Sequence, residues 1–266
     1  MTAGIKHIIA VASGKGGVGK STVTANLALA MAAQGKKVGV LDADIYGPSQ
    51  AHMLGVAPGT RPRAIDEKTM VPLEAHGIKV MSMAFLTDIE TAMVWRGPMV
   101  AGAFLQLLNQ TDWGELDYLF IDMPPGTGDI QLSLAQKVSV AGAVIVTTPQ
   151  DIALLDARRG IEMFRKVNIP VLGVIENMST HVCSQCGHVE PIFGEGGGDR
   201  IAENYETSVI ARLPLQLSIR EQSDGGNPSV IAEPEGVAAH AFIDAARHID
   251  VEVASATHAG PTIGFS

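Results

Sequence analysis

The segment SGKGGVGKST occupies residues 13–22, between an apolar run and a helical pattern. Glycines at the spacing Gly-x4-Gly-Lys-Ser let backbone N–H groups close around phosphates, and the N-terminus of the following helix favours their negative charge. Because the flanking patterns are a strand and a helix, we interpret the segment as a phosphate-binding loop rather than as a glycine-rich turn. The residues predicted to bind the nucleotide are Gly14, Lys15, Gly16, Gly17, Val18, Gly19, Lys20, Ser21 and Thr22.

The last three residues of this loop carry the expected phosphate chemistry. Lys20 would neutralise the β- and γ-phosphates of a nucleoside triphosphate, and Ser21 would ligate Mg2+. Thr22 is in position to reach the α-phosphate. The loop therefore predicts a nucleotide-binding and nucleotide-hydrolysing site.

Short apolar runs alternate with helical patterns along the rest of the chain. The runs are nearly continuous in hydrophobicity, which is typical of strands covered on both faces of a parallel sheet. The alternation predicts an α/β fold with a doubly wound, mostly parallel sheet, helices on both faces and ligands at the carboxyl ends of the strands. The expected strands are 7–13, 37–44, 78–85, 117–124, 141–149 and 170–178, and the clearest expected helices are 20–34, 99–109 and 151–167.

The length and composition favour one ordinary folded domain. The chain has 266 residues, of which 46% are hydrophobic and 18% are charged. We expect a P-loop domain over residues 1–250, a cysteine-containing insertion near 181–198 and an extended or disordered tail over 251–266. Residues 55–76, rich in Gly, Pro and charge, are expected to form a surface excursion.

The charge and hydropathy patterns also exclude several classes of protein. With a net charge of −9 the chain has no overall attraction to nucleic acid or to an anionic membrane. No apolar stretch approaches the roughly 18–20 residues of a membrane span. The first residues lack the basic flank of a signal peptide, and two cysteines do not make a disulfide scaffold, so we expect a cytoplasmic protein that binds neither membrane nor nucleic acid.

Carboxylates follow two of the expected strands. In LDADIYGPS, Asp42 and Asp44 are two residues apart, so an extended segment places them on one side. In LFIDMPPGTGD, an apolar run ends at Asp122, as in a strand whose carboxylate holds Mg2+ through its water shell. Carboxylates at strand ends more often cap helices or form turns, but a neighbouring phosphate loop favours the magnesium role. Gly126, in the loop after Asp122, is expected to offer a free N–H to the γ-phosphate.

The only two cysteines, Cys183 and Cys186, lie in the segment HVCSQCGH. A Cys-x-x-Cys pair is half of a tetrahedral metal site. A symmetric second copy could supply the other pair, while His181 and His188 could complete a zinc site within one chain. A redox dithiol is a third interpretation, which is weaker because the pair does not open a helix in a thioredoxin-like setting. The residues alone leave these three interpretations open.

The motifs form a combination that is more specific than any one of them. In order along the chain they are GKGGVGKST, DADIYGPS, WRGPM, DMPPGTGD, ENMS, CSQCGH and FGEGGG. Together they resemble the Mrp-type iron–sulfur carrier ATPases, relatives of MinD, of ParA and of the nitrogenase iron protein. The resemblance runs from about residue 5 to about residue 245. The small domain that precedes the P-loop in many members is not expected in this chain.

The resemblance implies roles for individual residues. Lys15 would cross the interface of a homodimer and act on the partner's ATP. Asp44 would orient the attacking water, and Asp42 would be an outer-shell partner of the magnesium. Asn177, in IENMS, would bond the adenine edge, and Pro214, in RLPL, would pack near the base.

The resemblance also implies a cargo. Cys183 and Cys186 would hold a [4Fe–4S] cluster shared between two subunits, received from an assembly scaffold and transferred to apo iron–sulfur proteins. Two rivals are a MinD- or ParA-like spatial organiser and a metabolic P-loop enzyme. A spatial organiser would favour a basic amphipathic C-terminal helix for a membrane or a basic face for DNA, and the sequence offers neither. A metabolic enzyme would need a pocket for an acceptor substrate, and we cannot identify one. Neither rival explains the cysteine pair.

Overall fold

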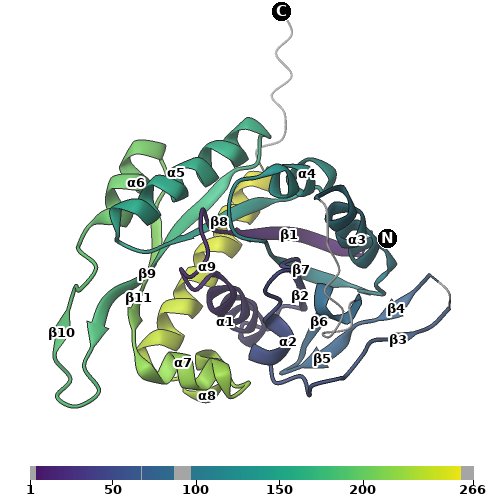
Figure 1. Ribbon diagram of the computed structural model, residues 1–266, viewed down its shortest axis with the longest axis horizontal. Coiled ribbons are helices and arrows are strands. Elements are labelled where there is room, and N and C mark those ends of the chain that lie inside the picture. Colours follow the sequence, from purple (N-terminus) through teal and green to yellow (C-terminus); the bar gives the residue numbers. More distant parts are fainter. Residues whose placement is uncertain (1–3, 67, 87–96, 259–266) are drawn as a thin grey trace, which may run out of the picture.

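A mostly parallel sheet forms the centre of the molecule (Figure 1). The structure is a computed structural model that describes residues 4–66, 68–86 and 97–258. The strand order within the described residues is β10-β9-β8-β1-β7-β2-β6-β5, with β11 paired to β9. This arrangement confirms the predicted α/β fold class. The parallel strands are β1 (Ile5–Ala12), β2 (Val38–Asp42), β6 (Ile78–Ser82), β7 (Leu116–Asp122), β8 (Gly142–Thr147), β9 (Val171–Val182) and β11 (Val209–Leu215). The antiparallel additions are β5 (Leu73–Ala75) and β10 (Val189–Glu190).

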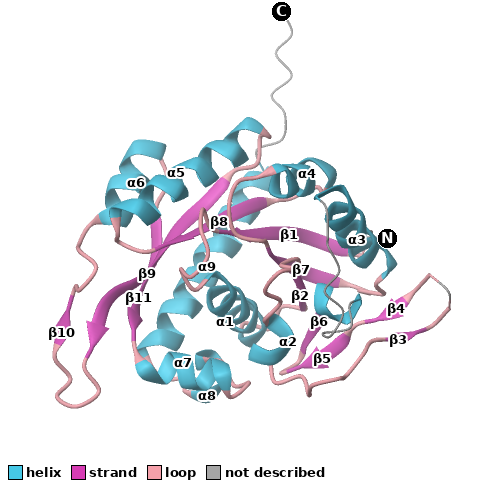
Figure 2. Ribbon diagram, viewed as in Figure 1, coloured by secondary structure: helices cyan, strands magenta, loops and turns pink. Residues whose placement is uncertain are grey.

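Helices cover both faces of this sheet (Figure 2). One layer contains α1 (Lys20–Ala33), α8 (Ser229–Ala232) and α9 (Val237–His258), with α2 (Gln50–Met53) and α7 (Leu217–Asp224) beside it. The other layer contains α3 (Gly97–Gln110), α4 (Asp129–Lys137), α5 (Asp151–Lys166) and α6 (Gly197–Tyr205).

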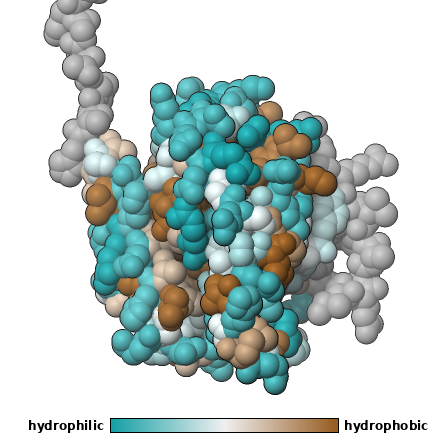
Figure 3. Space-filling model, turned by 90° about the vertical axis from the view of Figure 1, so that its left-hand side faces the viewer, coloured by the Kyte–Doolittle hydropathy of each residue, from teal (hydrophilic) through white to brown (hydrophobic). Residues whose placement is uncertain are grey.

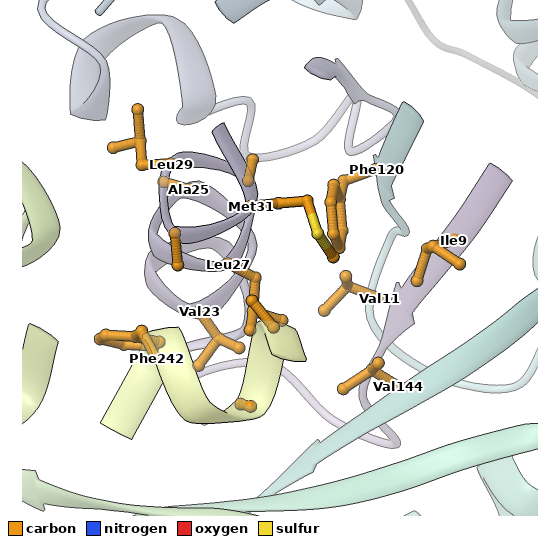
Figure 4. Close-up of a cluster of buried hydrophobic side chains, with 14 of the residues drawn as sticks. Ile9, Val11, Val23, Ala25, Leu27, Leu29, Met31, Phe120, Val144 and Phe242 are labelled. Carbon is orange, nitrogen blue, oxygen red and sulfur yellow. The ribbon is translucent and has the colours of Figure 1, made fainter. Parts of the chain in front are cut away.

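Two hydrophobic cores fill the space between the sheet and these layers. Successive residues of a strand point to opposite faces, so Ile9 and Val11 enter the core under α1 and α9, whereas Ile8 and Ala10 enter the core under α3 and α5. Figure 4 shows Phe242 of α9 packed close to α1 in the first core. Burial on both sides explains why the strands read as unbroken apolar runs.

The excursion between β2 and β6 is partly ordered. It contains a short antiparallel pair, β3 (Arg63–Ala64) with β4 (Met70–Val71), before the chain joins the sheet edge through β5. A 3-10 turn, η1 (Met83–Leu86), follows β6. Of the WRGPM motif, residues 95 and 96 lie outside the described residues.

The prediction of an extended tail over residues 251–266 is wrong for its first part. Helix α9 continues to His258, because Ile249 and Val253 keep the i,i+4 spacing and are both buried. Residues 259–266 lie outside the described part of the chain. In the described residues, no helix combines the length and the apolar character that a membrane span needs.

Candidate functional site

The phosphate loop connects the end of β1 to the start of α1 at the carboxyl edge of the sheet. Gly17 and Gly19 have φ values of 80° and 83°, a left-handed conformation that glycine adopts without steric cost. Lys20 opens α1 and is buried, and its Nζ forms an ion pair with the buried Asp122 carboxylate at the end of β7. The same Nζ lies 3.4 Å from Ser21 Oγ. The structure thus brings together three residues that the sequence predicted for phosphate and magnesium.

Asp122 has two further partners that the sequence analysis missed. Thr24 Oγ1 donates to Asp122 Oδ1 over 3.2 Å, and Gln50 Nε2 donates to Oδ2 over 2.8 Å. Gln50 Nε2 also bonds the Ser21 carbonyl at 2.8 Å. Thr24 could have been found by its place one helical turn after Lys20. Gln50 carried no local signal, because its partner is 72 residues away.

Asp42 lies in the same buried site, at the end of β2. Its Oδ2 accepts hydrogen bonds from the backbone N–H groups of Ser49 and Gln50, at 2.9 and 3.1 Å, and from Ser82 Oγ at 3.2 Å. Burial raises the pKa of Asp42 to about 7, and the negative charge of Asp122 acts in the same direction. In the sheet, Asp42 of β2 is paired with Asp122 of β7 on one side and with Ser82 of β6 on the other. These adjacent parallel strands therefore place all three residues at the same edge of the sheet.

Asp44 is held by its own turn rather than by the Asp122 cluster. Its Oδ1 accepts hydrogen bonds from the N–H groups of Tyr46 and Gly47, both at 3.2 Å. Its own N–H donates to Asp42 Oδ1 at 3.1 Å. The carboxylate is therefore fixed in the turn that follows β2, next to Asp42.

The loop after Asp122 differs from expectation at Gly126. Its N–H is not free, because it donates to the Ser13 carbonyl over 2.9 Å. The sequence could not show this bond, which depends on β1 and β7 being neighbours. The Ser13 hydroxyl in turn donates to the Lys15 carbonyl over 2.9 Å. The Lys15 ammonium has no hydrogen-bond or ion-pair partner within the described residues.

A pocket of about 300 Å³ adjoins the loop at Gly19 and Thr22. Asn177, at its wall, donates from Nδ2 to the Val18 carbonyl at 2.8 Å. A methyl group on Gly19 would lie 2.2 Å from that nitrogen, so only glycine allows this approach. Pro214 lines the same pocket, and most of the remaining wall is apolar, with contributions from Met178, Leu213, Leu215, Ile219 and Phe242. The pocket has the position and character of a site for a planar base.

The residues present fit a nucleotide with Mg2+. Two carboxylates, Asp42 and Asp122, share one buried site, and the pKa of Asp42 is raised first by burial and then by the charge of Asp122. A cation bound between the two carboxylates would favour their charged forms. Among the described residues Gln50 Oε1 is a buried acceptor without a hydrogen-bond donor, as expected beside a hydrated ion. Ser21, Asp42 and Asp122 would hold Mg2+, directly or through water, and Lys20 would exchange Asp122 for phosphate.

The cysteines lie in the turn between β9 and β10. The Cys183 N–H donates to the His188 carbonyl, and the Gly187 N–H donates to the Cys183 carbonyl, both over 2.9 Å. Both thiols are free, and Cys186 is exposed. Hydrogen bonds from the backbone of Gln185 and Cys186 lower the pKa of the Cys183 thiol, which favours the thiolate that binds metals.

This turn offers only half of a metal site. His181 and His188 both approach Glu190, at 3.8 and 3.9 Å. Within the described ranges, no three His, Cys, Asp or Glu side chains are grouped so that they could hold a metal ion. The face that carries the hairpin is mostly polar with scattered apolar groups (Figure 3), and Val189 and Ile192, near the cysteines, are exposed. The described part of the chain therefore does not bring together the side chains of a zinc site.

The cysteine turn is tied to the nucleotide pocket through β9. Glu176, the neighbour of Asn177, is buried and accepts a hydrogen bond from the Gly198 N–H at 2.5 Å, where α6 begins after the hairpin. Downstream of Asn177 on β9, Ser179 Oγ donates to the Leu213 carbonyl of β11 over 3.1 Å. Both ends of the segment that carries the cysteines are thus anchored next to Asn177.

Comparison with known proteins agrees with this geometry. The sequence profile of the ParA family described as NUBPL iron-transfer P-loop NTPase matches residues 4–250. A Pseudomonas fragi protein named iron-sulfur cluster carrier protein is 70% identical over 232 residues, which are 87% of this chain and 81% of that protein. An Escherichia coli protein of the same name is 59% identical over 87% of this chain and 63% of its own length, so the chain spans less than two thirds of that relative. The solved structure of a nucleotide-binding protein from Archaeoglobus fulgidus in complex with ADP has a TM-score of 0.74 and 42% identity, covering 85% of this chain and 88% of that one.

Proposed function

Because the chain belongs to the ParA family of NUBPL iron-transfer P-loop NTPases, we propose that it hydrolyses ATP and carries an iron–sulfur cluster between two copies of itself. The cluster is its cargo, received from an assembly scaffold and delivered to apoproteins. The relatives named as cluster carriers support the cargo, and the ADP-bound neighbour supports the nucleotide.

The observation that carries this proposal is the exposed Cys183–Cys186 turn. It offers two thiols, one with a lowered pKa, and no third metal-binding side chain among the described residues joins them. A [4Fe–4S] cluster takes four thiolates, so a two-fold axis between two copies completes the site. A cluster held at an exposed interface can be passed on when the two copies separate.

In the nucleotide site, different residues of the chain bind the phosphates, bind the base and orient the attacking water. The phosphate loop and Lys20 bind the β- and γ-phosphates, and the apolar pocket beside Asn177 takes the adenine. Bound Mg2+ supplies charge neutralisation for the phosphates. Asp44, fixed by the Tyr46 and Gly47 N–H groups, orients the water for in-line attack.

Lys15 is the residue by which a second copy of the chain would act on the bound nucleotide. Its ammonium has no partner in the described part of its own chain, and its backbone is fixed by Ser13. A lysine that reaches the nucleotide of the other copy stabilises the charge of the transition state there, as an arginine finger does. Hydrolysis is then slow in a single chain and faster in the dimer.

The test compares cysteine variants with a neighbour in the same turn. Cys183→Ser and Cys186→Ser should each lose the reconstituted cluster and its transfer to an apoprotein, and should keep the wild-type affinity for ADP. Ser184→Ala, between the two cysteines, is the matched control and should retain both properties. A full cluster in either serine variant would refute the shared four-thiolate site.

A further inference from the structure

Gln131 is a buried polar side chain with no role in the site described so far. It lies in the first turn of α4 and is 5% exposed. Its Nε2 donates to the Pro125 carbonyl over 2.8 Å and lies 3.3 Å from the Pro124 carbonyl. Both acceptors belong to the loop that follows Asp122, so one amide group holds two consecutive peptide carbonyls of that loop.

The same loop is held a second time at its next residue. The Gly126 N–H donates to the Ser13 carbonyl over 2.9 Å. The Gln131 amide also lies next to the two glycines of this loop. A methyl group added to Gly126 would be in van der Waals contact with Gln131 Nε2, at 3.7 Å, and one added to Gly128 would be in contact with Gln131 Oε1, at 3.4 Å. The loop is therefore fixed between the end of β1 and the first turn of α4.

This position of the loop bears on the terminal phosphate. A methyl group on Gly16 would lie 4.0 Å from the ring of Pro125, so the loop and the tip of the phosphate loop are near neighbours. With ATP in the proposed site, a γ-phosphate would need room and N–H donors on this side, whereas the Gly126 N–H is engaged with Ser13. ADP lacks that phosphate and would leave the loop as it is.

We propose that Gln131 is a positioning residue that holds the 124–126 loop in the arrangement seen in this structure and thereby favours ADP over ATP. The inference rests on the proposed ATP binding. Moving the loop to serve a γ-phosphate breaks the bonds from Gln131 Nε2, and a buried amide without an acceptor carries a free-energy cost. That cost falls on ATP alone, because ADP does not require the movement.

The experiment measures equilibrium affinities for ADP and for a non-hydrolysable ATP analogue, both with Mg2+. In Gln131→Met, which keeps the volume but has no donor, and in Gln131→Ala, the affinity for the analogue relative to ADP should rise by roughly 2–10-fold, the effect of one net hydrogen bond. Gln136→Ala, an exposed glutamine on the same helix, should leave the ratio unchanged. Hydrogen exchange at the Gly126 amide should be faster in both Gln131 variants.

The outcomes separate this inference from the proposed function. If wild-type protein binds neither nucleotide, the proposed ATP binding is wrong. If it binds both, and the ratio in the Gln131 variants is unchanged or shifts toward ADP, Gln131 does not hold the loop against ATP. Unchanged exchange at Gly126 would contradict the inference in the same way, including for a variant whose affinity cannot be measured.

Discussion

Lys20 and Asp122 form a buried ion pair across 102 residues of sequence. The pair exists because β1 and β7 are adjacent and in register, with Val11 beside Asp122, so that the lysine opening α1 meets the carboxylate ending β7. Phosphate binding would therefore exchange one anionic partner of Lys20 for another. In this structure Lys20 supplies the countercharge of the buried Asp122, whose other partners, Thr24 and Gln50, are neutral.

The first prediction follows from that pair. Lys20→Ala should lower the free energy of unfolding without nucleotide by about 3–5 kcal/mol, because it leaves a buried carboxylate without its countercharge. Urea unfolding measures this change. Lys36→Ala, which breaks the more exposed pair with Asp250, is the control and should cost about 1 kcal/mol or less. Equal losses of unfolding free energy in the two variants would show that the buried ion pair stabilises the fold no more than the exposed one.

Asp42 gives a prediction for pH. Its pKa is raised to about 7, so its charge destabilises the folded state above pH 7, and this penalty is relieved as pH falls from 7 toward the ordinary value near 4. Asp42→Asn removes the charge at every pH. Without Mg2+, the free energy of unfolding of the variant relative to wild type should therefore be more favourable at pH 8 than at pH 5. A difference that is independent of pH would contradict the raised pKa.

Asp44 should separate binding from hydrolysis. Asp44→Ala removes the carboxylate that we propose orients the water, but leaves the phosphate loop and Lys20 intact. Turnover should fall by roughly 10²–10⁴-fold, while the affinity for labelled ATP stays near that of wild type. Lys20→Ala should lose both. An equal loss of affinity in the two variants would show that Asp44 is part of the binding site rather than only of the chemistry.

Lys15 should contribute to ATP hydrolysis by the dimer and not to nucleotide binding by a single chain. Lys15→Ala should keep the affinity for ADP in dilute protein but lose the rise in specific ATPase activity with protein concentration. It should also weaken any effect of a non-hydrolysable ATP analogue on the rate of cluster transfer. Lys137→Ala, at the end of α4, is the control. Concentration-dependent activity in the Lys15 variant would mean that the lysine does not act across the interface.

Local patterns were sufficient to predict most of the fold. The phosphate loop and the central strands have strong signals because buried parallel strands are apolar throughout. Strand β11 was not predicted, because Arg212 and Pro214 interrupt its apolar pattern. It tolerates both because it pairs with β9 alone among the described strands.

Two kinds of contact were not predicted from the sequence. Gln131 bonds carbonyl groups only six and seven residues before it, but it lies outside every recognised motif. Gln50 has ordinary surroundings in sequence, and its partner Asp122, 72 residues away, comes within reach only in the folded sheet. The prediction of a free N–H at Gly126 was wrong because its acceptor, the carbonyl of Ser13, is likewise distant in sequence. Carboxylates at strand ends were predicted because parallel strands bring their carboxyl ends together.

If two chains share one cluster, the metal content of the dimer must show it. The chain is reconstituted anaerobically with iron and sulfide, its mass in solution is measured, and iron, sulfide and zinc are counted per chain. We expect a dimer with about two iron and two sulfide per chain, the content of one shared [4Fe–4S] cluster, and no zinc. A monomer that retains about one zinc per chain and takes up no iron would contradict it.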